Sequence, residues 1–168
     1  GVSTNAFSVL PKIENLTGSL KGTQSSGRLA LNTKNGSVFF PEVFKQAHSI
    51  KQLQGLVTWQ QTSDQWLLAT EQLVIENADI QTKTKLALSI PKNDQAVFID
   101  LQTSFSNMHN ISSTANYYPV DAMDKDLVDW LEMALVSGRI VDGKALIYGD
   151  LNQLPFVDGQ GVFEVLFN

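Results

Sequence analysis

Apolar and polar residues alternate along most of the first two thirds of the chain, and this period of two constrains the fold more than any other feature. Segment 56–61 shows it at Val57 and Trp59, and the apolar segment 66–70 follows after the polar segment Thr62 to Gln65. Alternation over such short segments predicts half-buried β-strands, and a polar connection of this length predicts a hairpin. The centre of the chain is therefore expected to be antiparallel β-structure.

The same spacing recurs on both sides of this hairpin. Apolar residues at i, i+2 positions occur at Leu29/Leu31, Leu73/Ile75, Leu86/Leu88/Ile90 and Val97/Ile99/Leu101. Asn35-Gly36 follows the first pair and predicts a turn that leads into Val38. We expect residues 1–110 to form a β-meander with one apolar face and one neutral-polar face. Strands that bend at recurring glycines, such as Gly18 and Gly55, predict a curved sheet that forms a groove.

The period changes after the Ser/Asn-rich stretch 104–116. Five apolar residues then fall on one helical stripe, Leu127, Trp130, Leu131, Ala134 and Leu135. This spacing predicts one amphipathic α-helix at about 124–137, with Gly138 just beyond its end. We expect Leu127, Trp130, Leu131 and Leu135 to dock the helix onto the sheet. Three more strands are predicted at 139–141, 145–151 and 161–167, so residues 111–168 form a second part that continues the same sheet.

Composition excludes several classes of function. The chain has 168 residues, a net charge of −5 and no cysteine. Without a Lys/Arg cluster, an acidic chain is a poor ligand for nucleic acid or for anionic lipid headgroups, and without cysteine it has no thiol chemistry. No uninterrupted apolar run exceeds four residues, so we expect no transmembrane segment in this sequence. Because it begins Gly1-Val2-Ser3, we interpret it as a fragment of a much longer protein.

The sequence contains few candidate catalytic or metal-binding residues. His48 and His109 each stand without a second ligand at metal-binding spacing, so we predict no metal site and no cofactor. Asp124 and Asp126 form the one acidic cluster that could act catalytically, as in a carbohydrate-active enzyme. This interpretation is weaker than the two that are given below for the apolar sheet face. Acids in the first turn of a helix more commonly stabilise its dipole. We therefore predict a protein that is not an enzyme and has no catalytic residue.

The apolar sheet face has two possible roles. It can cover an ordinary closed core, or it can remain partly open and hold acyl chains while the sheet ladder satisfies the backbone. One helix with a five-residue stripe covers too little area for all the predicted strands. This mismatch favours an open groove.

Specific motifs resemble a known family. They are Tyr117-Tyr118-Pro119, Trp130-Leu131, Ala134-Leu135, Gly138, Gly149-Asp150-Leu151 and Pro155-Phe156, preceded by Leu53 to Trp59, Trp66 and Leu73 to Asp79. This series resembles the YhdP family of AsmA-like envelope proteins of Gram-negative bacteria. The likeness covers nearly the whole chain and is most specific from Tyr117 to Phe156.

The resemblance implies a periplasmic segment of an inner-membrane-anchored protein, similar to TamB, that carries phospholipids along a β-groove built of AsmA-like repeat units. Its expected partners are phospholipid acyl chains and adjoining repeats of the same full-length chain. Such transport would support the permeability barrier of the outer membrane. The alternative is a non-catalytic envelope scaffold or protein-interaction module with a closed β core. If the groove is open, the expected lining residues are Leu29, Leu31, Val57, Trp59, Trp66, Leu68, Leu73, Ile75, Leu86, Leu88 and Ile90.

Overall fold

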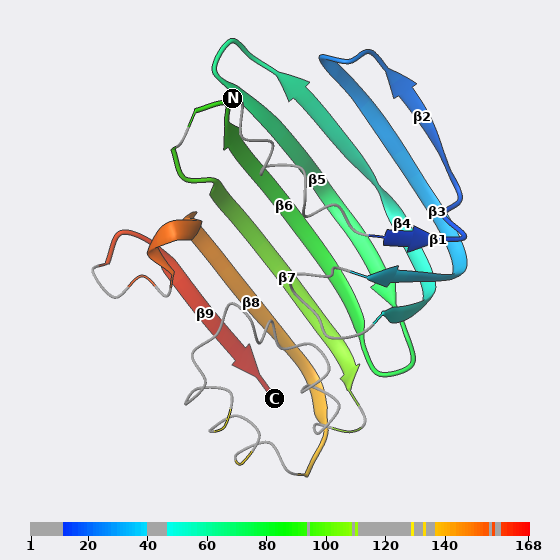
Figure 1. Cartoon of the computed structure of the whole chain (residues 1–168). Helices are drawn as coiled ribbons and strands as arrows, with labels where there is room; N and C mark the ends of the chain where they lie inside the picture. The colour runs from blue at the N-terminus through cyan, green and yellow to red at the C-terminus, as the bar shows by residue number, and fades with distance from the viewer. Residues whose placement is uncertain are drawn as a thin grey trace.

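A single open β-sheet makes up the described part of the chain (Figure 1). The computed structural model describes residues 12–39, 47–93, 95–108, 110, 129, 133, 137–154, 156 and 159–168. In chain order the strands are β1 (Lys12–Glu14), β2 (Gly18–Gly22), β3 (Ser26–Phe39), β4 (His48–Gln61), β5 (Gln65–Glu76), β6 (Gln81–Pro91), β7 (Phe98–Met108), β8 (Ile140–Asp150) and β9 (Val162–Phe167). A short 3-10 helix, Leu151–Gln153, follows β8.

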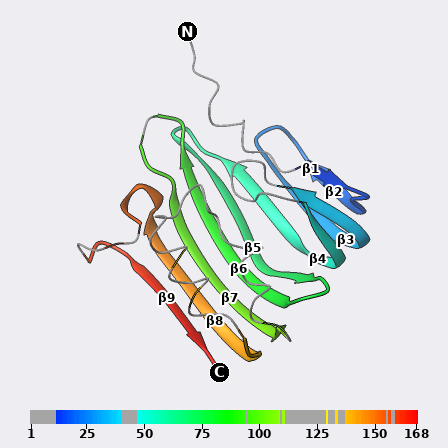
Figure 2. The same cartoon turned by 60° about the horizontal axis from the view of Figure 1, so that its bottom comes forward.

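The topology is a meander. From β3 to β9 each strand pairs antiparallel with the next strand in the chain, while β1 and β2 both pair with the outer edge of β3. The sheet is twisted and its long strands bend, as the two views in Figures 1 and 2 show. The prediction of a mainly β, antiparallel, open sheet is confirmed. The sheet also continues beyond residue 111 through β8 and β9, although the division of the chain at residue 110 stays a prediction.

The predicted hairpin is confirmed as β4 and β5. Its turn is closed by the Thr62 amide, which donates to the Gln65 carbonyl at 2.8 Å. The Thr62 hydroxyl donates to the Asp64 carboxylate at 2.8 Å, and the Lys92 ammonium donates to the Thr62 carbonyl at 2.6 Å. These local side-chain bonds explain why a polar segment without glycine makes a tight turn.

The predicted turn at Asn35-Gly36 is wrong. Asn35 lies inside β3, with a left-handed φ of 56°, and Gly36 continues the ladder opposite Ile50. Asparagine tolerates this conformation in a single residue, so the strand bends without reversing its direction. The bend brings Ile50 into one buried cluster with Leu31 and Leu53. Asn107 adopts the same conformation in β7, next to a second buried pair, Met108 and Ile140.

The segments predicted as two strands at 139–141 and 145–151 are one strand, β8. Gly143 continues the ladder, opposite Phe105 in β7 and Phe167 in β9. The Phe105 ring occupies the space where a side chain on residue 143 would lie. The glycine therefore makes room for an aromatic ring and does not end a strand. The third predicted strand is confirmed as β9.

The helix predicted at about 124–137 lies almost entirely outside the described residues. Asp129 and Met133 are described and have helical backbone conformation. The expected docking residues Leu127, Trp130, Leu131 and Leu135 lie outside the described residues, so their role stays a prediction. No helix within the described part is long and apolar enough to span a membrane.

Candidate functional site

The ladder register decides which side chains share a face, because directly opposed residues on neighbouring strands point to the same side. Leu29 lies opposite Val57. In the next row, Leu68 lies between Trp59 on one neighbouring strand and Leu88 on the other. We call this side the apolar face. It carries Leu20, Leu29, Leu31, Leu53, Val57, Trp59, Trp66, Leu68, Leu73, Ile75, Leu86, Leu88, Ile90, Ile99, Leu101, Phe105, Ile147, Phe163, Val165 and Phe167.

All eleven residues predicted to line a groove lie on this one face. Leu31 alone among them is buried, and the other ten are half-buried. A closed core would bury most of such a set, and a free surface would expose it. The face is therefore neither sealed nor fully open to water, and whether it contacts lipid stays a prediction.

A β-bulge in β5 keeps the apolar face continuous. Thr70 lies opposite Leu86 and Leu73 lies opposite Thr84, so Glu71 and Gln72 together face only one residue of β6. The same extra residue shifts the register against β4. A bulge of this kind reverses the alternation, because two successive residues project to the same side. The predicted strand 66–70 and the apolar pair Leu73/Ile75 therefore belong to one strand, β5.

Threonine hydroxyls interrupt the apolar face near its centre. Thr84 and Thr103 are directly opposed, and their hydroxyl oxygens are 2.8 Å apart. Thr70 is only 4% exposed, and its hydroxyl has no hydrogen-bond partner among the described residues. These threonines were not among the predicted lining residues, although Thr84 is two positions from Leu86 and Thr103 is two positions from Leu101, which places each on the same face of its strand. That spacing was the available signal.

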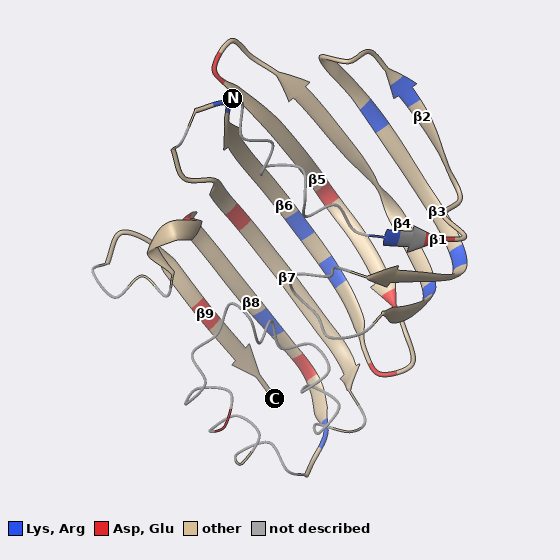
Figure 3. Cartoon of the chain, in the orientation of Figure 1, with Lys and Arg blue, Asp and Glu red and all other residues tan. Residues whose placement is uncertain are grey.

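The opposite side, the polar face, carries every charged side chain of β5 to β9. They are Glu71, Glu76, Lys83, Lys85, Asp100, Asp142, Lys144, Asp150 and Glu164. Figure 3 shows these charges spread over several strands. The Lys85 ammonium and the Glu71 carboxylate form an exposed ion pair at 2.9 Å, and this hydrogen bond and the negative charge raise the pKa of Lys85.

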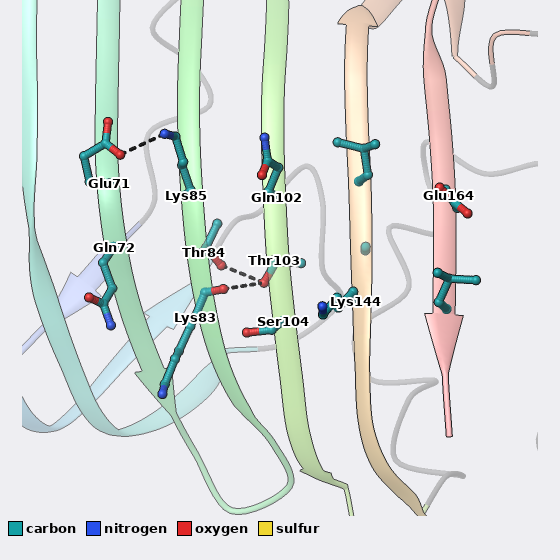
Figure 4. A pocket seen from close by; sticks show the side chains of 13 residues that line it. Glu71, Gln72, Lys83, Thr84, Lys85, Gln102, Thr103, Ser104, Lys144 and Glu164 are labelled. Carbon is teal, nitrogen blue, oxygen red and sulfur yellow. Dashed lines mark hydrogen bonds and ion pairs between the residues drawn. The ribbon is translucent and has the colours of Figure 1, made fainter.

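A shallow cavity of about 620 Å³ lies over β5 to β9 on the polar face. Its wall contains three lysines and two glutamates, together with Gln72, Gln102 and Ser104 (Figure 4). None of the eleven predicted lining residues borders it. This cavity thus lies on the side of the sheet opposite the predicted groove lining. Thr84, Thr103 and Ala145 also border it, although the ladder register places their side chains with the apolar face.

Of the candidate metal and catalytic residues, only His48 lies within the described residues. His48 is half-buried at the start of β4, where burial lowers the pKa of its imidazole and the charge of Asp79 opposes this effect. No group of three His, Asp or Glu side chains that would suit a metal ion occurs within the residues described. His109, Asp124 and Asp126 lie outside them.

Comparison with known proteins gives two matches. The family model described as "YhdP protein" matches residues 1–168. The Intermembrane phospholipid transporter YhdP of Escherichia coli (strain K12) is 27% identical over 161 residues, which cover 95% of this chain and 12% of that protein. No solved structure matches the chain.

Proposed function

Because the chain belongs to the YhdP family, we propose that it forms one segment of a bridge-like protein that carries phospholipids between two membranes. The observation that carries this proposal is the apolar face, which runs across the sheet from β2 to β9 and is half-buried along most of its area. The name of the E. coli relative, an intermembrane phospholipid transporter, supports the same substrate class.

In the proposed mechanism, acyl chains lie on the apolar face and the headgroup stays in water. Each CH₂ group removed from water contributes roughly 0.8 kcal/mol, so two chains bind well in total. Movement by a small step exchanges one set of similar contacts for another, since leucine, isoleucine and valine dominate the face. Transport along such a surface is passive and needs no catalytic residue.

The longer protein would extend this surface. The chain spans only 12% of the length of its E. coli relative. Strand β9 is a sheet edge with exposed apolar side chains on both faces, including Phe163, Leu166 and Phe167. An edge of this kind favours pairing with another strand. We propose that adjoining segments of the same chain continue the sheet, and that the protein is an inner-membrane-anchored one whose periplasmic part includes this segment.

The test is site-specific photo-crosslinking in cells that produce the full-length protein. A photo-reactive amino acid is placed at Leu73 or Leu88, which are half-buried on the apolar face. The matched controls are Gln72, beside Leu73 in the bulge, and Lys85 in β6, both exposed on the polar face. We expect phospholipid adducts at the first two positions and not at the controls.

Two results would contradict the proposal. Adducts at none of the four positions in a folded, stably produced protein would favour the alternative, an envelope scaffold with a closed core. Adducts at Gln72 and Lys85 alone would move the lipid path to the polar face and its cavity.

A further inference from the structure

The centre of the apolar face contains a group of hydroxyls that acyl chains alone do not require. Thr70 lies opposite Leu86, and Thr84 is two residues from Leu86 on the same face of β6. Diagonal neighbours of this kind lie roughly 7–8 Å apart, within reach of one bound molecule. Thr103 lies beside Thr84, with 2.8 Å between their hydroxyl oxygens.

Donor protons in this group are incompletely used. The Thr84–Thr103 hydrogen bond uses one of their two hydroxyl protons, and the Thr103 hydroxyl donates the other to the Lys83 carbonyl at 3.4 Å. This second bond is long for a hydroxyl donor, so a better-placed carbonyl would replace it. The Thr70 hydroxyl has no partner within the described part of the chain, although it is buried. A buried hydroxyl without a partner costs stability, so its presence calls for an explanation.

The bulge in β5 allows Thr70 and Leu73 to lie together on the apolar face. Without the extra residue at Glu71-Gln72, Thr70 and Leu73 would lie on opposite faces of the sheet. Bulges often redirect a side chain at a binding site. The same local feature therefore keeps the apolar face continuous and presents a hydroxyl donor within it.

We propose that Thr70, Thr84 and Thr103 form a hydrogen-bonding station for the ester carbonyl groups of a diacyl lipid lying on the apolar face. A phospholipid brings two ester carbonyls, which accept hydrogen bonds but cannot donate them, directly next to its apolar chains. The station has that same arrangement, with hydroxyl donors surrounded by Leu68, Leu73, Leu86 and Leu101. This inference rests on the proposed function and adds the part of the lipid that is recognised.

The experiment compares two probes on the purified 168-residue chain. One is a diacyl phosphatidylethanolamine, and the other is the di-O-alkyl ether with the same chain lengths and headgroup but no carbonyl oxygens. We expect the ester lipid to bind about five- to twenty-five-fold more tightly, since one net hydrogen bond corresponds to about fivefold in affinity.

Two variants test whether the preference for the ester lipid depends on the threonine hydroxyls or on apolar packing. Replacing Thr70, Thr84 and Thr103 together by valine keeps the shape and the β-propensity, and should bring the ester-to-ether ratio close to one. Affinity for the ether lipid should stay within about twofold, which also shows that the variant is folded. Thr58→Val, on the polar face, is the matched control and should keep the wild-type ratio.

The outcomes distinguish the two proposals. If both lipids bind wild type equally, or if the valine variant keeps the ester preference, the station is wrong while the apolar face remains the lipid site. If neither lipid binds the wild-type chain, the proposed function of this segment fails and the station fails with it.

Discussion

A carboxylate placed on the apolar face should weaken phospholipid binding far more than the same group placed on the polar face. Leu88 is the position to change, because it lies between Leu68 and Ile99 in one row and is half-buried. Thr58 is the matched control. It is exposed on the polar face opposite Arg28, so Thr58→Asp places the new carboxylate in water beside a cation.

The expected magnitude follows from the environment of Leu88. Complete burial of a leucine side chain is worth roughly 1.5–3 kcal/mol, and contact with an acyl chain supplies about 1 kcal/mol of this where the side chain is already half-buried. Covering a polar group that lacks a partner costs at least about 1–3 kcal/mol more. Leu88→Asp should therefore lower the affinity by about 2–4 kcal/mol, which is about 30- to 700-fold.

Tryptophan fluorescence provides the assay. Trp59 and Trp66 lie on the apolar face, so a phospholipid with brominated acyl chains should quench them on binding. Replacing Trp130 by phenylalanine in every variant leaves those two as the reporters. Titration then gives a dissociation constant for each variant, and circular dichroism confirms that each is folded. An equal loss of affinity in Leu88→Asp and Thr58→Asp would refute the assignment of the lipid to the apolar face.

Three further changes test other parts of the structure. Gly143→Ala should lower the free energy of unfolding by about 1–3 kcal/mol in urea titrations, because the added methyl group meets the Phe105 ring. Burial in the folded chain lowers the pKa of His48 from its usual value of 6.5. As the pH falls below that value, the unfolded chain therefore binds more protons than the folded chain does. Stability should therefore fall as the pH drops through 6.5, with a smaller fall in His48→Gln, measured by urea unfolding at about pH 7.5 and about pH 5.5. Replacing the exposed β9 residues Phe163 and Phe167 by serine should reduce concentration-dependent association of the isolated chain in sedimentation velocity experiments.

Alternation along the sequence was enough to predict the class of fold and to select eleven apolar residues that lie on one face. Leu86, Leu88 and Ile90 could be placed on one face from their even numbers alone, because β6 contains no irregularity between them. Odd or even position no longer predicts the face of a side chain wherever the backbone departs from the regular strand. At Glu71-Gln72 the bulge depends on pairing with both neighbouring strands, which no local pattern reports.

Asparagine and glycine were misread for a related reason. Asn35-Gly36 has the composition of a hairpin turn, yet the long partner strand β4 pairs with β3 on both sides of it. Strands were predicted at 139–141 and 145–151, whereas Gly143 continues a single ladder beside the Phe105 ring. In both cases the outcome depends on a residue from another strand, so tertiary pairing overrides the local preference.

The threonine station and passive transport are compatible only if the station binds weakly. A net hydrogen bond of about 1 kcal/mol holds a lipid about fivefold longer than a purely apolar stretch does, which delays its movement without trapping it. A charged partner would hold it much more strongly, and the described charges of β5 to β9 all lie on the polar face. In β5 to β9 the sheet thus keeps its charged groups off the proposed lipid path, and the polar side chains that it leaves there carry hydroxyls. That separation is what a surface must have if a polar, two-chained molecule is to be recognised and still move along it.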